Sequence, residues 1–168
     1  MIFVTAGHKE FDRLIKQMDS ISINIETEII MQIGYKPSYL PKNTEYFNFI
    51  QRNEIDGYFQ RAELIISHCS VGVLLRAQKH LKPLIMVPRQ HILKEHVDDH
   101  QVGFARMLIE HNNVEGIELV FDINDLQDII ERVMQDKKPV ALKSFGQKKN
   151  LIETLQNFVS NVKKNKKC

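Results

Sequence analysis

The residues of this chain that could do chemistry gather between Ser67 and Gln101. An apolar stretch, Leu64–Ile66, runs into a turn of small and polar residues, His68–Gly72, and a second apolar stretch, Leu84–Val87, ends in a polar and charged loop. In an open α/β sheet, strand ends of this kind build an anion-binding crevice from helix-terminal amides and loop side chains. The pattern therefore predicts a site for an anionic group.

Single residues in these turns support that prediction with different strength. Ser70 offers a hydroxyl donor and Gly72 exposes backbone amides, which suits a phosphate-binding turn. His68 fits either a phosphate contact or a structural hydrogen bond. Gly7, between Thr5 and His8, permits close approach of the backbone to a ligand, but glycine also serves ordinary turns. The dinucleotide pattern G-x-G-x-x-G and the Walker A pattern are absent, which argues against nicotinamide cofactors and nucleoside-triphosphate hydrolysis.

Two reactive possibilities in the same region are weighed and rejected. His96 and His100 are four residues apart, as metal ligands on one helix would be, but the protease pattern H-E-x-x-H is missing. Asp98, as the expected N-cap of the following helix, would leave His96 outside it and separate the imidazoles. We therefore expect no metal. A buried turn also predicts an unreactive thiol at Cys69.

The elements that must position these residues alternate between strand and helix, which predicts one doubly wound, Rossmann-like parallel sheet, α/β in class. Ligands then bind beyond the carboxyl ends of the strands. Strands are expected at 1–6, 28–33, 45–49, 64–66, 84–87 and 116–121, and helices at 10–19, 53–61, 71–80, from the Asp98 N-cap to Glu110, from Asn124 or Asp125 onward, and 147–162.

Size and composition fit one soluble domain, predicted over residues 1–162. The chain has 168 residues, 43% of them hydrophobic, and a net charge of +2, so the overall charge does not indicate nucleic acid. No apolar run approaches a membrane span and no secretory signal is evident. The two cysteines do not form the framework of a disulfide-rich protein, so we expect the protein to work in the reducing cytoplasm. The basic tail, 163–168, fits either a solvated end or contact with anionic lipid.

Several longer motifs resemble one family, the glycosyltransferase family 28 C-terminal domain in its short free-standing form. The similarity runs over residues 1 to 135 in order. It is carried by Ile2–Gly7 with Phe11–Leu14, by Pro41–Asn43 with Glu45–Phe47, by Ala62–His68, by Val87–Arg89 and by Glu95–Gln101, the last reading E-H-V-D-D-H-Q.

This resemblance implies the donor-binding half of a GT-B glycosyltransferase that transfers a sugar from a UDP-sugar, with inversion and without a metal cofactor. The implied partner is a membrane-associated, acceptor-binding subunit of the PssD type carrying a lipid-linked saccharide in exopolysaccharide or glycolipid assembly; a homo-oligomer is the alternative. The chain would work in the cytoplasm, recruited to the membrane's inner face. By position, the implied donor-binding residues are Thr5, Gly7, His68, Ser70, Gly72, Arg89, Glu95, His96, Asp99, His100 and Gln101.

The general base often belongs to the acceptor half of such enzymes, and His8 is the candidate on this chain. Cys69, Ser70, Val73 and Arg76 depart from the family pattern, where smaller or hydroxyl residues and a ribose-binding glutamate are usual. These departures leave two alternatives open: an accessory subunit that has lost catalysis, and a stand-alone enzyme that modifies nucleotide sugars.

Overall fold

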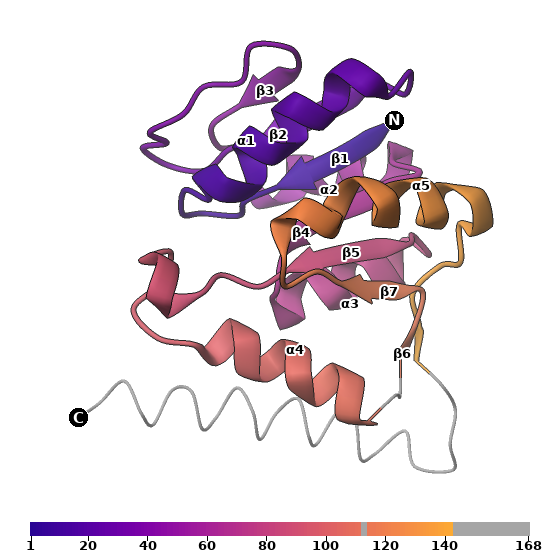
Figure 1. The fold of residues 1–168 in the computed structure, drawn as a ribbon. Coiled ribbons are helices and arrows are strands. Elements are labelled where there is room, and N and C mark those ends of the chain that lie inside the picture. Colours follow the sequence, from indigo (N-terminus) through magenta and orange to yellow (C-terminus); the bar gives the residue numbers. More distant parts are fainter. Residues whose placement is uncertain (112–113, 143–168) are drawn as a thin grey trace.

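A computed structural model describes residues 1–111 and 114–142 (Figure 1). Its centre is a six-stranded sheet in the order β3-β2-β1-β4-β5-β7, with every neighbouring pair parallel. Thr5 lies opposite both Gln32 and Ser67, so the strands end along one edge. The strands are β1 Ile2–Thr5, β2 Ile29–Gln32, β3 Glu45–Phe47, β4 Leu64–His68, β5 Leu84–Val87 and β7 Ile117–Leu119.

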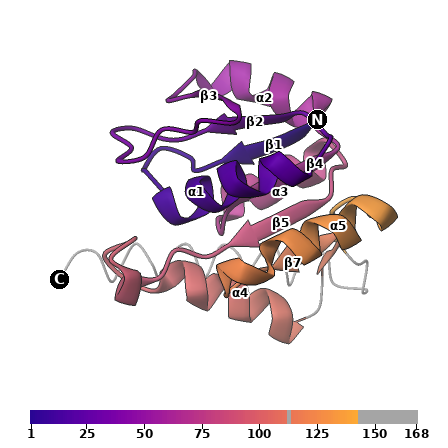
Figure 2. The ribbon, with the colours of Figure 1, turned by 45° about the horizontal axis from the view of Figure 1, so that its top comes forward.

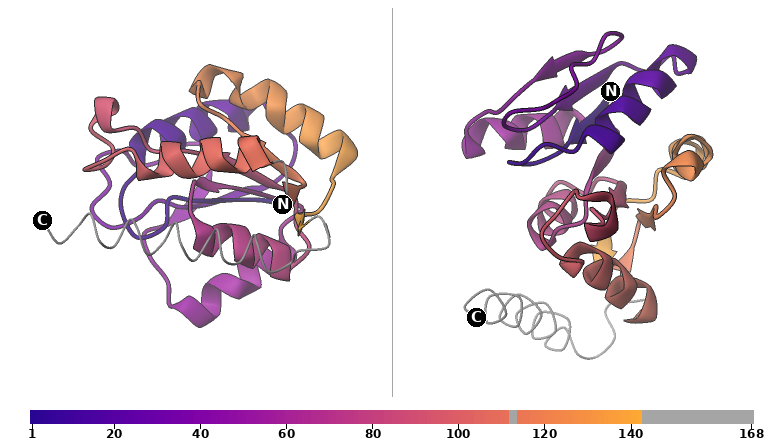
Figure 3. Two further views of the ribbon diagram at one scale, coloured as in Figure 1. Left: turned by 90° about the horizontal axis from the view of Figure 1, so that it is seen from below. Right: turned by 60° about the vertical axis from the view of Figure 1, so that its left-hand side comes forward.

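Helices cover both faces of this sheet and bury two apolar clusters, which confirms the doubly wound prediction. Figures 2 and 3 show α1 and α5 together on one face, with α2 and α3 on the other. Leu14 and Ile130 belong to the first cluster, and Phe59, Leu74 and Phe104 to the second. The helices are α1 Asp12–Ile21, α2 Arg52–Arg61, α3 Val71–Lys79, α4 His100–His111 and α5 Leu126–Asp136, with short 3₁₀ turns η1 Ser22–Asn24, η2 His91–Leu93 and η3 Ile123–Asp125. None of the helices within the described residues is long and apolar enough to cross a bilayer.

The structure corrects the prediction of a single last strand over 116–121. Gly116, at φ +70°, separates a two-residue strand, β6 (Val114–Glu115), from β7. A further strand, β8 (Ala141–Leu142), pairs antiparallel with β6 in a separate ribbon. The helix predicted at 147–162 and the basic tail at 163–168 lie outside the described residues, so the domain boundary at 162 stays a prediction.

A buried carboxylate fixes the loop that joins β2 to β3. Asp19, at the end of α1, is 1% exposed and accepts hydrogen bonds from the Tyr39 hydroxyl at 2.6 Å and from the amides of Lys42 and Asn43, both at 2.9 Å. Burial raises the pKa of Asp19, but these hydrogen bonds outweigh it and hold the pKa below its usual value. The motif Pro41–Asn43 therefore has a structural role, because it binds this carboxylate.

We expect Asp19→Asn to lower the free energy of unfolding at pH 7 by about 2 kcal/mol, because an amide nitrogen cannot accept from the backbone donors it would face. A group with a lowered folded pKa stabilises above its unfolded value and loses that contribution as the pH falls. The gap between wild type and variant should therefore narrow below pH 4 in urea titrations. Glu26→Gln, at an exposed acid, is the control. An unchanged stability at pH 7 would contradict the assigned role.

Candidate functional site

A cavity of about 360 Å³ opens at the carboxyl ends of β1, β2 and β4, between the sheet and helices α2 and α3. It lies where the strand order reverses, between β1 and β4, which is the usual ligand position in an open α/β sheet. The cavity brings together six of the predicted site residues: Thr5, Gly7, His8, His68, Ser70 and Gly72. It is lined in addition by Gln32, Phe49, Ile50, Ile55, Phe59, Val73 and Arg76.

Gly7 is required by the close approach of two turns. It has φ +76°, and a Cβ there would meet the His68 Cε1 atom at 2.6 Å. Its amide donates to the Thr5 hydroxyl at 3.1 Å, and that hydroxyl in turn donates to Gln32 at the end of β2. The glycine therefore serves the contact between the β1 turn and the imidazole of His68.

The hydrogen bonds around His68 define its state. Ser67 Oγ donates its one hydrogen to the Thr5 carbonyl at 2.8 Å and lies 3.2 Å from His68 Nδ1. Nδ1 can be the donor of that pair, and the His68 side chain also hydrogen-bonds to the Thr5 backbone. Burial, followed by the charge of Arg89, lowers the pKa of His68 to about 3. Without ligand, His68 is thus a neutral imidazole at the cavity wall.

The first turn of α3 supplies amide donors to the cavity. Ser70 is the N-cap, with Oγ accepting from the Val73 amide at 3.3 Å. As in any helix, the first-turn amides of Val71 and Gly72 have no carbonyl partner within the helix, so they are suited to an anion. The open space beside Gly72 leaves room for one. Cys69 is 1% exposed, and burial raises the pKa of its thiol to about 12, which matches the predicted unreactive cysteine.

The outer rim of the cavity is aromatic and basic. His8 is exposed and stacks on Tyr35, with Phe49 edge-on at 5.5 Å between ring centroids. Arg76 pairs with Asp56 at 2.8 Å and lines the cavity from α3. Sequence reasoning missed Gln32, the last residue of β2, and Phe49, two residues after β3, although their positions at strand ends were a usable signal.

Arg89 ties the loop after β5 to the turn after β1. It is 3% exposed, and its guanidinium donates to the carbonyls of Ala6 at 2.7 Å, Lys9 at 2.9 Å and Glu10 at 3.2 Å. The group lies over the Phe11 ring at 4.7 Å. Burial lowers the pKa of Arg89 to about 10, so it stays charged at neutral pH.

Two more residues assigned by resemblance to donor binding also contact protein groups. Glu95 accepts from Arg13 Nε at 2.6 Å and Nη2 at 3.0 Å, and from the Gln90 amide at 2.9 Å. Gln101 is 3% exposed, and its Oε1 accepts from the Arg89 amide at 3.1 Å. In this arrangement both residues hold the loop after β5. Direct donor contacts by Arg89, Glu95 and Gln101 stay predictions.

The remaining predicted residues lie outside the first cavity. Glu95, His96 and Asp99 line a shallow hollow of about 830 Å³ beside Lys9 and Glu10. His100 lies next to His96 at the beginning of α4. The prediction that Asp98 caps this helix and separates the two imidazoles is wrong: α4 begins at His100, and the ring centroids are 4.4 Å apart.

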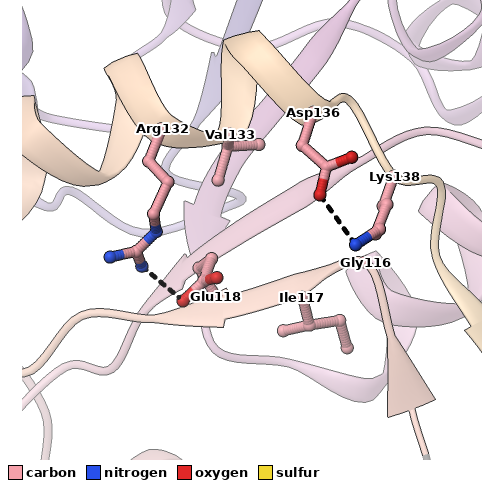
Figure 4. A pocket seen from close by; sticks show the side chains of 7 residues that line it. All are labelled: Gly116, Ile117, Glu118, Arg132, Val133, Asp136 and Lys138. Carbon is pink, nitrogen blue, oxygen red and sulfur yellow. Dashed lines mark ion pairs between the residues drawn. The ribbon is translucent and has the colours of Figure 1, made fainter.

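A further cavity, of about 190 Å³, lies at the opposite edge of the sheet, beside the beginning of β7 (Figure 4). Two ion pairs cross it, Arg132 with Glu118 at 2.9 Å and Lys138 with Asp136 at 2.8 Å. Its charged groups therefore neutralise one another, and it does not meet the carboxyl ends of the strands.

Together, the strand order and the crevice define a Rossmann-like domain with a cavity at its switch point, the usual ligand position in such a sheet. Residues 1–165 match the glycosyltransferase family 28 C-terminal domain. The chain belongs to this family, which confirms the resemblance seen in its motifs.

Relatives agree with this assignment. The chain is 28% identical over 121 residues to the human UDP-N-acetylglucosamine transferase subunit ALG13 and 27% identical over 120 residues to the mouse protein. These matches cover 64% and 63% of the chain but 10% of each relative, so the chain spans about a tenth of their length.

Solved structures share the fold. MurG of Acinetobacter baumannii superposes with a TM-score of 0.56 at 17% identity, over 79% of this chain and 40% of that one. A glycotransferase of kitacinnamycin gives 0.58 at 11% identity, over 97% and 38%. The fold is that of one half of a GT-B glycosyltransferase.

We expect Gly7→Ala to destabilise the protein by about 2 kcal/mol, because alanine is strained at this φ and its Cβ displaces the His68 ring. Gly57→Ala, inside α2 where a Cβ has open space, is the matched control and should be neutral or stabilising. Equal effects of the two substitutions in thermal and urea unfolding would remove the proposed contact.

A second prediction follows from the lowered pKa of His68. The unfolded chain binds a proton below its usual value of 6.5 and the folded chain does not until about 3, so stability should fall as the pH drops between those values. The slope attributable to His68 is about 1.4 kcal/mol per pH unit. His68→Asn should reduce the slope of unfolding free energy against pH between pH 6 and 4. His91→Asn, at an exposed histidine, should leave this slope unchanged. Equal slopes for wild type and His68→Asn would contradict the prediction.

Proposed function

We propose that this chain is the donor-binding and catalytic subunit of a hexosyltransferase that uses a UDP-sugar. The observation that carries the proposal is the crevice at the switch point, where the first turn of α3 opens into a cavity beside Gly7 and His68. Family membership supports the reaction class, and the name of the similar ALG13 proteins supports the UDP-sugar donor.

The diphosphate would lie against the amides of Val71 and Gly72, with the Ser70 hydroxyl as a further donor. Helix-terminal amides favour negative charge through both their hydrogen bonds and the helix dipole. Arg76 lines the cavity wall and is paired there with Asp56, so a diphosphate would compete with that carboxylate for it. These groups can stabilise the departing diphosphate, so we propose that the transfer itself needs no metal ion.

In an inverting transfer, an acceptor hydroxyl attacks the anomeric carbon while the bond from that carbon to the diphosphate oxygen breaks. The bonding electrons leave with UDP, and the hydroxyl proton passes to a base. His8 lies at the rim of the cavity, exposed and stacked on Tyr35, and is the candidate base on this chain. A base on the acceptor-binding subunit is the other source.

The acceptor would come from a second, membrane-associated subunit of the PssD type that presents a lipid-linked saccharide. The name of ALG13 as a transferase subunit supports a two-subunit enzyme. Exposed apolar residues on the loops at the same edge of the sheet also favour a facing partner: Tyr35, Phe49, Ile92 and Val97, which are 59%, 53%, 83% and 69% exposed. Such a partner would recruit this chain to the cytoplasmic face of the membrane; self-association is the alternative.

Gly72→Leu separates binding from folding. Leucine is a better helix residue than glycine, so stability should hold or rise. Its side chain, however, would fill the space beside the first-turn amides. Loss of one charge-assisted hydrogen bond predicts at least a tenfold weaker UDP affinity in calorimetry.

Gly103→Leu, an exposed glycine of α4 with open space, is the matched control and should retain wild-type affinity. Absence of saturable UDP and UDP-sugar binding by the wild type would favour the accessory-subunit alternative. Equal UDP affinities of wild type and Gly72→Leu would contradict the proposal that the diphosphate binds at the first turn of α3.

A further inference from the structure

Three side chains with metal-ligating atoms converge where the loop after β5 enters α4. His96, Asp98 and His100 each offer one ligand atom, and these atoms all lie within 4.8 Å of one another. The two imidazole rings are edge-on at 4.4 Å between centroids, and Asp98 Oδ1 contacts Nδ1 of both, at 3.2 Å for His96. The loop thus brings the two imidazoles into contact with the same Asp98 carboxylate.

His96 has a buried polar atom that the protein leaves unsatisfied. Its side chain is 10% exposed, and Nδ1 makes no hydrogen bond to any described residue, because the nearby Asp98 oxygen lacks hydrogen-bond geometry. A buried polar atom of this kind costs about 1–3 kcal/mol when it has no partner. Native structures retain few such atoms. A ligand that His96 Nδ1 shares with the neighbouring Asp98 and His100 side chains would explain why this atom has no hydrogen bond.

The surrounding loop is held in place independently of the cluster. The His91 amide donates to Asp99 Oδ1 at 2.8 Å, and His91 Nδ1 lies 3.1 Å from the His96 carbonyl. At the other side, Glu95 is fixed by the bidentate contact to Arg13. The three ligating side chains therefore start from a constrained backbone, which lowers the entropic cost of binding an ion.

We propose that His96, Asp98 and His100 bind a divalent transition-metal ion, with Zn²⁺ as the best match. Two imidazole nitrogens and one carboxylate oxygen are a common zinc donor set, and water can fill the fourth position.

The bound ion would clamp the end of the loop to the first residue of α4. This role is separate from the transfer chemistry proposed above, in which the diphosphate meets α3. An ion held by His96 and His100 would occupy side chains that the family resemblance assigns to the donor, so the ion and a donor contact at these two residues are alternatives. The competing explanation is that Asp98 only holds the two imidazoles together, by a hydrogen bond to His100 and a charge contact to His96, with no ion involved.

The test uses tag-free protein stripped with a chelator. Zn²⁺ is titrated in competition with a chromogenic chelator, and Co²⁺ by visible absorption, which reports coordination geometry. We expect one equivalent to bind, and His96→Ala and His100→Gln each to weaken binding at least tenfold, since loss of a supporting partner alone typically costs that much. His80→Gln, at the C-cap of α3 and outside this loop, should bind as wild type does.

Absence of stoichiometric binding by the wild type would overturn the proposal, and so would equal affinities for wild type, His96→Ala and His100→Gln. Circular dichroism of each stripped variant establishes that it is folded; Asp98→Asn, which retains one oxygen, provides a further variant expected to bind more weakly. UDP calorimetry on the stripped wild type separates this proposal from the function proposed above, because its outcome depends on α3 and not on the metal.

Discussion

The arrangement of the crevice depends on one buried cation. The Arg89 guanidinium joins three carbonyls of the turn after β1 to the loop after β5, and no other described side chain bridges these two segments in the same way. Carbonyls in a tight turn need donors, and a planar guanidinium can satisfy several at once. Because this turn contains Gly7, the position of Arg89 also sets the contact between Gly7 and His68. A residue of the loop after β5 therefore positions the turn that lines the cavity at the ends of β1 and β4.

Many residues of the family motifs form hydrogen bonds and ion pairs that hold the loops around the crevice in place. Arg13 and Glu95 lie far apart in the sequence and form one bidentate pair, while Asp19 binds the loop that contains Pro41–Asn43. Their sequence pattern reflects the hydrogen bonds of a scaffold as much as contacts with a donor. The polar groups that line the cavity come mainly from the strand ends and α3: the first-turn amides and Ser70 of α3, His68, Thr5 and Gln32, with His8 and Arg76 at the rim. Under the proposed function, a site made largely of main-chain donors would tolerate the departures at Cys69 and Val73, since neither removes an amide.

The fold was predictable from the sequence because strands and helices alternate with clear periodicity. The cavity was predictable in part, since the turns at Gly7 and His68–Gly72 follow strands and must meet at one edge. Long-range pairs such as Arg89 with the carbonyl of Ala6 were not predictable. The periodicity of a sequence does not show which polar groups hydrogen-bond to each other in the folded chain. The same limit explains the wrong separation of His96 and His100: Asp98 reads as an N-cap, but the helix begins two residues later. β8 was missed because two residues carry no periodicity.

The central claim is that this scaffold presents the first turn of α3 to a diphosphate. Amide chemical-shift mapping with UDP tests it most directly, with uridine as the ligand that lacks the phosphates. If the diphosphate binds there, UDP should give saturable shifts that are largest at Gly7, Val71 and Gly72, and uridine should give none at Val71 and Gly72. Shifts confined to the loop at 91–99 or to the cavity beside β7, or the same pattern for both ligands, would contradict it.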